Sequence, residues 1–413
     1  AWSAAGTVFA QSMMTLTIII LGRLLEPTDF GIVAYASVFS TFLMLFLHLG
    51  FGEALIQRSD LQDEHVDSAF WASVGAGTLL TAIGLGIAYP IAWITGEPQL
   101  RPMVQGLSLA CVLVGLRTVP DAMLRRDLQF RQVALRRSLG VLVGGALGVT
   151  MALMDFGAWA LVGQRIATDL VMTITTWLAS RYKPHLRASW RHIKPLLGFG
   201  ANVFGVQLLS FMGTRGDQLL IGVFLGSEAL GYYAIARRLL SQIRSLLIQI
   251  ARQVALPALS KLQQDLPRFR AAVLQGTRLS CSLAMPPLML LAVLCPEVIE
   301  VVLGPKWLPA TMVACVLSLM ALHNSLLTLF VPTLQGLGKP SRVLLQRSVV
   351  LSVDMVSFFL VYRWGIEAVA IAYTIRAYLL TPLAFWLIRR TSGLTAWQWL
   401  RAALQPILFA IAT

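Results

Sequence analysis

Long apolar stretches separated by short polar breaks run through this sequence from end to end. Most have about 20 residues or more, the length that an α-helix needs to cross the hydrocarbon core of a bilayer. The breaks contain residues that favour turns, such as proline and glycine. The stretches lie at roughly 1–22, 30–56, 67–94, 102–124, 132–154, 157–180, 197–222, 229–256, 270–295, 308–334, 342–362 and 365–388. This pattern predicts an all-α integral membrane protein with about twelve transmembrane helices.

Both ends of the sequence interrupt this pattern. The first residue is Ala1, without an initiator methionine, and it already lies inside an apolar stretch. At the other end, residues 391–413 begin as an amphipathic segment and close on a run that reads as the start of a further transmembrane helix. We therefore expect the full protein to contain more spans than the about twelve counted here.

Charged residues make up 13% of the chain and hydrophobic residues 57%, whereas about a quarter of a soluble domain is charged. The net charge is +14. Clusters of Lys and Arg occupy alternate breaks, at 125–137, 181–194, 261–270, 339–342 and 389–390. Such clusters remain on the cytoplasmic side of a membrane, so both ends of the chain are predicted to be cytoplasmic. This arrangement explains the positive charge without a nucleic-acid partner.

Residues that bind metals or cofactors form no recognisable pattern. The four cysteines lie within or beside apolar stretches without metal-ligand spacing, the five histidines do not cluster, and there is no glycine-rich phosphate loop. The sequence predicts no cofactor, no metal and no enzymatic activity.

An internal repeat relates the two halves of the chain. Five small or apolar residues recur at a fixed separation: Gly22, Leu25, Gly31, Ala34 and Ala36 match Gly222, Leu225, Gly231, Ala234 and Ala236. Each repeat holds six spans, and an even number returns the chain to its starting side. The halves therefore have the same orientation, related by a pseudo-two-fold axis along the membrane normal.

The repeat predicts four regions. Residues 1–182 form an N-terminal six-helix lobe, 183–196 a cytoplasmic linker, 197–390 a C-terminal six-helix lobe, and 391–413 the amphipathic segment and the start of a further helix. Two lobes of this kind imply a substrate site between them.

The run Gly22-Arg-Leu-Leu-Glu-Pro-Thr-Asp-Phe-Gly31 closely resembles the first helical hairpin of the Wzx-type polysaccharide transporter family, part of the multidrug/oligosaccharidyl-lipid/polysaccharide flippase superfamily. Further landmarks of that family match at 52–58, 124–131, 230–233, 256–260, 296–298 and 303–307. The resemblance covers nearly the whole chain. It is strongest to the branch that exports colanic acid, succinoglycan and xanthan-type exopolysaccharides.

The resemblance implies a V-shaped pair of lobes in the bacterial inner membrane that alternate between inward-open and outward-open states. The cargo would be an undecaprenyl-pyrophosphate-linked oligosaccharide, flipped from the cytoplasmic to the periplasmic leaflet. Membrane lipid, a polysaccharide polymerase and export machinery are the implied partners. Two other functions remain open. A cation-coupled drug exporter of the same superfamily would have an acidic, aromatic pocket, and a membrane glycan polymerase or ligase would have a large periplasmic loop.

Arginines inside the apolar stretches are the candidates for binding the pyrophosphate. A charged residue at the bilayer centre costs about 2.5–3.5 kcal/mol on insertion scales, so each should face a partner or a wet cavity. The stretch 229–256 contains Arg237, Arg238 and Arg244 on one arc of the helix, and Arg376 lies in the middle of 365–388. Guanidinium groups bind phosphate oxygens in a bidentate manner.

Intramembrane carboxylates are the candidates for ion coupling: Asp354, Asp169 and Glu53. Asp169 stands four residues after Arg165, so the two side chains could simply pair with each other. His323 and Asn324 are the candidates for contacts with sugar hydroxyls, although hydrogen bonds between helices would explain them equally well.

Overall fold

The computed structural model describes residues 2–47, 52, 55–56, 61–180, 182–185 and 190–412. Within these ranges the side chains of 2–5, 7, 190–204, 206, 243–258, 260–261, 405 and 407–412 are not described. Every element in the described part of the chain is a helix. The chain divides into two compact units, Ala1–Gly231 and Tyr232–Thr413.

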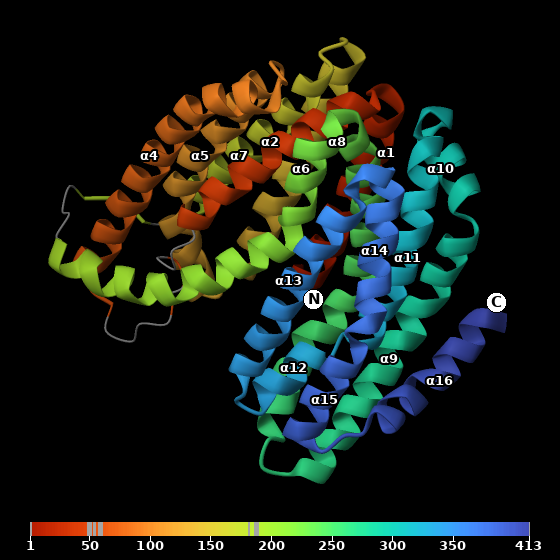
Figure 1. Cartoon of the computed structure of the whole chain (residues 1–413). Helices are drawn as coiled ribbons and strands as arrows, with labels where there is room; N and C mark the ends of the chain where they lie inside the picture. Colours follow the sequence, from red (N-terminus) through yellow and green to blue (C-terminus); the bar gives the residue numbers. More distant parts are fainter. Residues whose placement is uncertain are drawn as a thin grey trace. The chain divides into compact units, whose positions relative to one another are not determined.

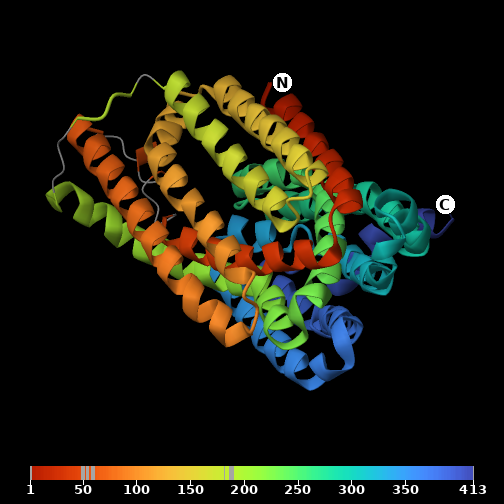
Figure 2. The same cartoon turned by 90° about the horizontal axis from the view of Figure 1, so that it is seen from above.

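Antiparallel helices build the first unit (Figures 1 and 2), and short turns join α1 to α2, α4 to α5, α5 to α6 and α6 to α7. Helix α4 packs on α5, α6 packs on α7 and α1, and α5 also contacts α2 and α7. The helices are α1 (Trp2–Leu24), α2 (Pro27–Leu47), α4 (Asp63–Thr95), α5 (Leu100–Arg126), α6 (Phe130–Leu153), α7 (Ala158–Ala179) and the first part of α8 (Trp190–Lys261). Gly226, with a φ of 86°, interrupts α8.

Small residues allow α6 and α7 to approach closely. Gly140, Gly144 and Gly148 recur every four residues along one face of α6, and α7 packs against that face. A Cβ atom on Gly148 would lie 2.8 Å from the Cβ of Gln164 on α7. In lipid, where helix association depends on van der Waals packing, a stripe of small residues of this kind draws two backbones together.

Two of the long helical segments of the second unit are interrupted. Its elements are the last part of α8, α9 (Leu266–Val293), α10 (Cys295–Leu303), η1 (Pro305–Ala310), α11 (Thr311–Leu326), α12 (Phe330–Gly336), α13 (Pro340–Val361), η2 (Tyr362–Trp364), α14 (Gly365–Leu379), α15 (Thr381–Ser392) and α16 (Ala396–Ala412). Helices α11 and α12 together cover one predicted span, and α14 and α15 cover another. Helix α16 packs along α9 (Figure 1).

Eight stretches of the described chain are long and apolar enough to cross a membrane. Two of them each contain two predicted spans: Gln207–Gln242 includes the interruption at Gly226, and Pro340–Ser392 includes η2. Helices α1 and α7 supply the remaining spans. The prediction of an all-α membrane protein with about twelve transmembrane helices is confirmed.

Three residues of the basic cluster at 125–137 lie in a helix and not in a loop. Helix α6 begins at Phe130 and contains Arg131, Arg136 and Arg137. Arg136 lies in its second turn with an exposed fraction of only 5%. The apolar stretch at 132–154 begins only two residues later than α6 does. Arg136 is buried because it contacts Asp121 on α5 and Thr176 on α7.

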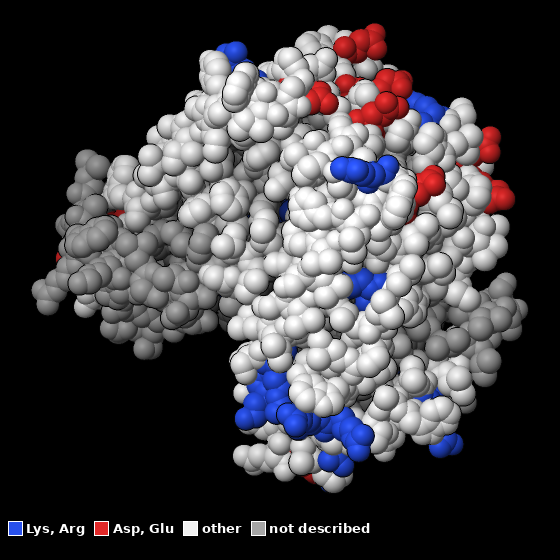
Figure 3. Space-filling view, in the orientation of Figure 1, with Lys and Arg blue, Asp and Glu red and all other residues white. Residues whose placement is uncertain are grey.

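The charged residues of the second unit separate towards its two ends. Lys and Arg gather at the end formed by the start of α13 and the last turn of α15, which contains Arg389 and Arg390 (Figure 3). Carboxylates lie at the opposite end, where Glu297 is in the first turn of α10 and Glu367 in the first turn of α14. A wide surface between the two ends carries few charges (Figure 3).

Candidate functional site

Proline explains both helix interruptions in the second unit. Pro332 cannot donate a hydrogen bond to the carbonyl of Thr328, which lies in the break 327–329 between α11 and α12. Pro382, the second residue of α15, likewise follows the break at Leu380. A proline inside a helix removes one backbone hydrogen bond and its ring clashes with the preceding turn. Interrupted transmembrane helices are a common location for binding sites because they expose polar backbone groups.

Each break begins four residues after a candidate site residue. The backbone N–H of Leu327 donates to the carbonyl oxygen of His323 at 3.3 Å, and that of Leu380 donates to the carbonyl oxygen of Arg376 at 2.9 Å. A side-chain contact joins the two breaks, because Nε2 of His323 lies 2.8 Å from the hydroxyl of Thr381. The fold therefore brings His323 and Arg376 to neighbouring positions on α11 and α14.

Further hydrogen bonds hold α11 and α14 in register. The hydroxyl of Thr374 donates to the carbonyl of Val316 at 3.2 Å, and that of Tyr378 donates to the carbonyl of Leu319 at 3.1 Å. The ring of Tyr378 also packs at 4.9 Å from the ring of His323. These contacts fix the face of α14 that presents Arg376.

A buried ion pair lies at the centre of this region. Nη2 of Arg376 is 2.7 Å from Oδ1 of Asp354 on α13, and the two side chains are only 10% and 13% exposed. Arg237 on α8 also acts electrostatically on Asp354. Two guanidinium groups therefore act electrostatically on this one carboxylate. A buried charge without a full complement of partners is costly.

Several polar atoms near the ion pair lack partners. Nε of Arg376, the hydroxyl of Tyr373 and Nδ1 of His323 are buried and make no hydrogen bond within the described residues. Buried polar groups in proteins are almost always hydrogen-bonded. Three unsatisfied groups so close to the buried guanidinium of Arg376 indicate a position for water or an anionic ligand.

The remaining sequence candidates of the second unit are less informative. Arg237 and Arg238 are both half-buried on α8, and each has a further interaction. Asn324 is half-buried, and its backbone carbonyl accepts a hydrogen bond from Thr328 at 3.2 Å. The side chain of Arg244 lies outside the described residues, and so does the whole of Glu53, a candidate from the first half of the chain.

Asp169, in the first unit, is held by two arginines. Its carboxylate is 2.7 Å from Nε of Arg165, four residues earlier on α7, and 2.8 Å from Nη1 of Arg117 on α5. The pairing with Arg165 follows from helical spacing. Arg117 was not anticipated, because 52 residues separate it from Asp169. Both carboxylate oxygens are therefore engaged, and the ion-coupling role of Asp169 stays a prediction.

A second buried network explains the position of Arg136. Its guanidinium pairs with Asp121 on α5, and Nη1 donates to the hydroxyl of Thr176 on α7 at 2.9 Å. Asp121 also pairs with the exposed Arg125 at 3.0 Å. Asp121 lies close to the end of an otherwise apolar stretch. A carboxylate in such a position is the signal in the sequence that a basic partner lies nearby.

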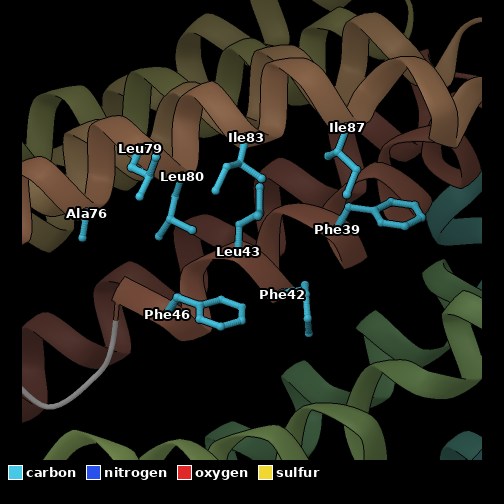
Figure 4. Close-up of a pocket in the computed structure, with 9 residues that line it drawn as sticks. All are labelled: Phe39, Phe42, Leu43, Phe46, Ala76, Leu79, Leu80, Ile83 and Ile87. Atoms are coloured by element: carbon cyan, nitrogen blue, oxygen red, sulfur yellow. The ribbon is translucent and has the colours of Figure 1, made fainter. Parts of the chain in front are cut away.

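An apolar pocket of about 450 Å³ lies between α2 and α4 of the first unit (Figure 4). Its lining includes Phe39, Phe42 and Leu43 from α2, and Leu79 and Ile83 from α4. No polar side chain lines it. The pocket therefore suits a hydrocarbon chain and offers nothing to a charged head group.

Solved structures similar to this chain include transporters. The lipid II flippase MurJ in its inward closed conformation aligns with a TM-score of 0.78 at 13% identity, over 99% of this chain and 91% of that one. An inward-facing multidrug resistance MATE family transporter aligns with a TM-score of 0.68 at 15% identity, over 93% and 95% of the two chains. At these identities the likeness shows the fold alone.

Similarity at the level of sequence is more specific. The succinoglycan biosynthesis transport protein ExoT of Rhizobium meliloti is 28% identical over 82% of this chain and 68% of its own length. The teichuronic acid biosynthesis protein TuaB of Bacillus subtilis is 25% identical over 100% and 86%. The lipopolysaccharide biosynthesis protein WzxC of Escherichia coli is 23% identical over 77% and 66%. Residues 20–312 match the profile of a polysaccharide biosynthesis protein family. The resemblance drawn from the sequence is therefore confirmed, and the chain belongs to this family.

Proposed function

We propose that this protein flips a lipid-linked oligosaccharide, carried on undecaprenyl pyrophosphate, from the cytoplasmic to the periplasmic leaflet for exopolysaccharide assembly. Family membership supports this function, and the succinoglycan relative is described as a transport protein. The fold is that of transporters, including a lipid II flippase. The same comparisons support the prediction that the chain is not an enzyme.

The single observation that carries the proposal is the buried positive charge at the interrupted helices. The pyrophosphate of the cargo is an anion that must cross a low-dielectric region, where an unpaired charge is very costly. Arg376 and Arg237 offer fixed positive charge there, and Nε of Arg376 has no hydrogen-bond partner within the described residues, so it can donate to a phosphate oxygen. Guanidinium groups suit phosphate oxygens because their planar N–H donors match them in pairs.

The alternative of a cation-coupled drug exporter is less well supported. Organic cations would be repelled by the buried guanidinium group of Arg376, which presents an unused N–H donor within the described residues. A glycan polymerase or ligase is also less well supported, because the connections between helices in the described chain are short. The buried positive charge therefore favours an anionic cargo.

The orientation that we propose places both ends in the cytoplasm of a bacterial cell. The basic end of the second unit, with Lys339, Arg389 and Arg390, would face the cytoplasm, and the acidic end, with Glu297 and Glu367, the periplasm. The division into lobes at 1–182 and 197–390, the polymerase and the export machinery remain part of this proposal.

The function can be tested with purified protein in liposomes. A fluorescent undecaprenyl-pyrophosphate oligosaccharide is placed in both leaflets, and a membrane-impermeant reductant bleaches the outer one. Active protein should bring the inner fraction into the reach of the reductant. Protein-free and wild-type liposomes that bleach to the same extent would contradict the proposal.

Substitutions connect this activity to the site. Arg237→Gln and Arg376→Gln should each lower the rate of flipping by at least about tenfold, because a charge-assisted contact with the phosphate is lost. Arg363→Gln removes an exposed arginine outside the helices of the site and is the matched control. Equal rates of flipping in all three variants would show that the site does not contribute to transport.

A further inference from the structure

We propose that the carboxylate of Asp354 holds, in the unloaded protein, the position on Arg376 that a phosphate oxygen of the cargo takes on binding, and that the displaced carboxylate then takes up a proton. This inference rests on the proposed function and names the groups that exchange at its site.

The donors of Arg376 are not all used. A guanidinium group has five N–H donors, and within the described residues the guanidinium of Arg376 contacts a single carboxylate, that of Asp354, at 2.7 Å. Its Nε has no hydrogen-bond partner there, and neither has the hydroxyl of Tyr373, three residues earlier on the same helix. These free donors can donate hydrogen bonds to a phosphate oxygen on the side of the guanidinium that the carboxylate leaves open.

Charge balance explains why Asp354 is needed when no cargo is bound. A guanidinium buried to this extent without an anion would carry a large desolvation cost. Asp354 compensates the charge of Arg376 while the protein is empty. When a phosphate arrives, it compensates the same charge, and the carboxylate becomes a second anion in a confined, poorly hydrated space. Conversion to the neutral carboxylic acid removes that repulsion.

The exchange changes no covalent bond of the cargo. Hydrogen bonds form between the guanidinium and a phosphate oxygen, and the contact between the guanidinium and the carboxylate breaks. One proton from water binds the carboxylate of Asp354. The arginine remains charged throughout. Release of the cargo reverses each step and restores the ion pair.

The other charged and titratable groups around Asp354 come from two packed helices, within the described part of the chain. They are Arg237 and Tyr233 on α8, and Tyr373 and Arg376 on α14. His323 on α11 interacts electrostatically with Arg376. Arginine and tyrosine do not ordinarily titrate between about pH 5.5 and 8. His323 is therefore the second group that could make anion binding depend on pH, and the test must separate it from Asp354.

The test measures binding of farnesyl pyrophosphate to the full chain in phosphatidylcholine nanodiscs, at pH 5.5 and pH 8. For the wild type we expect Kd to rise by about tenfold between these values, because the ionised carboxylate competes for Arg376. Asp354→Asn should bind about tenfold more tightly than the wild type at pH 8, with little further change at pH 5.5. Arg363→Gln should behave as the wild type. Ionisation of the probe itself affects the measured Kd of all the proteins in the same way, so it does not alter the comparison between them.

Several results would overturn the exchange. One is an Asp354→Asn variant that binds no more tightly than the wild type at pH 8. Another is a pH dependence that persists in this variant and disappears in His323→Asn, which would identify the histidine as the titrating group. Should Asp354→Asn fail to fold, the double variant Asp354→Asn/Arg376→Gln leaves no buried charge unpaired. It should bind weakly at both pH values, and tight binding by it would contradict the proposal.

The uptake of protons on binding provides an independent check. Addition of farnesyl pyrophosphate to weakly buffered protein at pH 7 should draw protons from solution beyond those that the probe takes up in the double variant. No difference between the two proteins would contradict the exchange.

Two further ligands identify the source of the phosphate. Inorganic pyrophosphate should bind at least about tenfold more weakly than farnesyl pyrophosphate, since it lacks the lipid chain. Phosphatidylglycerol in the nanodisc should not displace the probe. Equal binding of the inorganic ion, or displacement by the phospholipid, would mean that the site is not specific for a lipid pyrophosphate. Wild-type protein that flips the fluorescent cargo but shows none of the expected Asp354 effects would leave the flippase function standing and refute the exchange alone.

Discussion

Gly31 and Gly231 pack against each other's segments in a reciprocal manner. A Cβ atom on Gly31 would overlap the carbonyl oxygen of Ser227, and a Cβ atom on Gly231 would overlap the carbonyl oxygen of Pro27. All four residues belong to the first unit. Gly31 and Gly231 are equivalent in the internal repeat, and so are positions 27 and 227, because the same separation joins both pairs. A contact in which equivalent residues of the two repeats make the same interaction with each other's segment is typical of a two-fold axis.

This reciprocity predicts matched effects of substitution. Gly31→Ala and Gly231→Ala should each destabilise the protein by about 1–3 kcal/mol, because the methyl group meets backbone that cannot rotate away. Thermal unfolding in detergent, followed by size-exclusion chromatography, measures the loss. Gly213→Ala on α8 is the control, because a Cβ there meets nothing within 4 Å. If either glycine variant is as stable as this control, the close contact does not exist.

The buried pair of Arg136 and Asp121 predicts a strong asymmetry between single and double variants. Asp121→Asn should destabilise the protein by about 3–5 kcal/mol, because it leaves Arg136 buried without an anion. Asp121→Asn combined with Arg136→Met should recover most of that loss. Arg125→Gln should cost no more than about 1 kcal/mol, since Arg125 is half exposed. A double variant as unstable as Asp121→Asn alone would contradict the ion pair.

Tyr182 attaches the segment 182–185 to α4. Its hydroxyl donates to Asp67 at 2.7 Å, and the backbone N–H of His185 donates to the same carboxylate at 3.2 Å. Burial raises the pKa of Tyr182, and the hydrogen bond to Asp67 raises it further. Tyr182 therefore stays a donor at neutral pH, and its contribution to stability is complete below about pH 10, the unfolded value, and is lost as the pH rises through the folded value.

Two measurements check this attachment. Tyr182→Phe and Asp67→Asn should both speed tryptic cleavage after Arg181 at pH 8, because the anchor is lost. The tyrosinate absorbance of the wild type minus that of Tyr182→Phe should appear only above the ordinary range for tyrosine. An ordinary titration of Tyr182, together with unchanged cleavage, would show that the segment is not held by this hydrogen bond.

Charge separation predicts the topology. Reporters fused after Lys183 or Arg390 should read as cytoplasmic, and reporters inserted near Glu97 or Glu297 should read as periplasmic, because basic segments stay on the cytoplasmic side. Alkaline phosphatase and green fluorescent protein fusions give opposite signals on the two sides. A periplasmic signal at Lys183 would reverse the proposed orientation.

Local patterns in the sequence determined the membrane fold, the number of spans and the family. Each depends on residues close together in the chain, because a transmembrane helix satisfies its own backbone and needs only an apolar stretch of sufficient length. Helical spacing also predicted the contact of Arg165 with Asp169. The interruptions at Pro332 and Pro382 were not predicted, because 308–334 and 365–388 each read as one continuous apolar span.

The partners of the buried charges were decided by tertiary structure. Arg376 meets Asp354 across two helices, His323 meets Thr381 across 58 residues, and Arg117 reaches Asp169 from another helix. Nothing in the local sequence chooses such partners. The cost of burying a charge in lipid requires that each one find a partner, but which residue supplies it depends on how the helices pack.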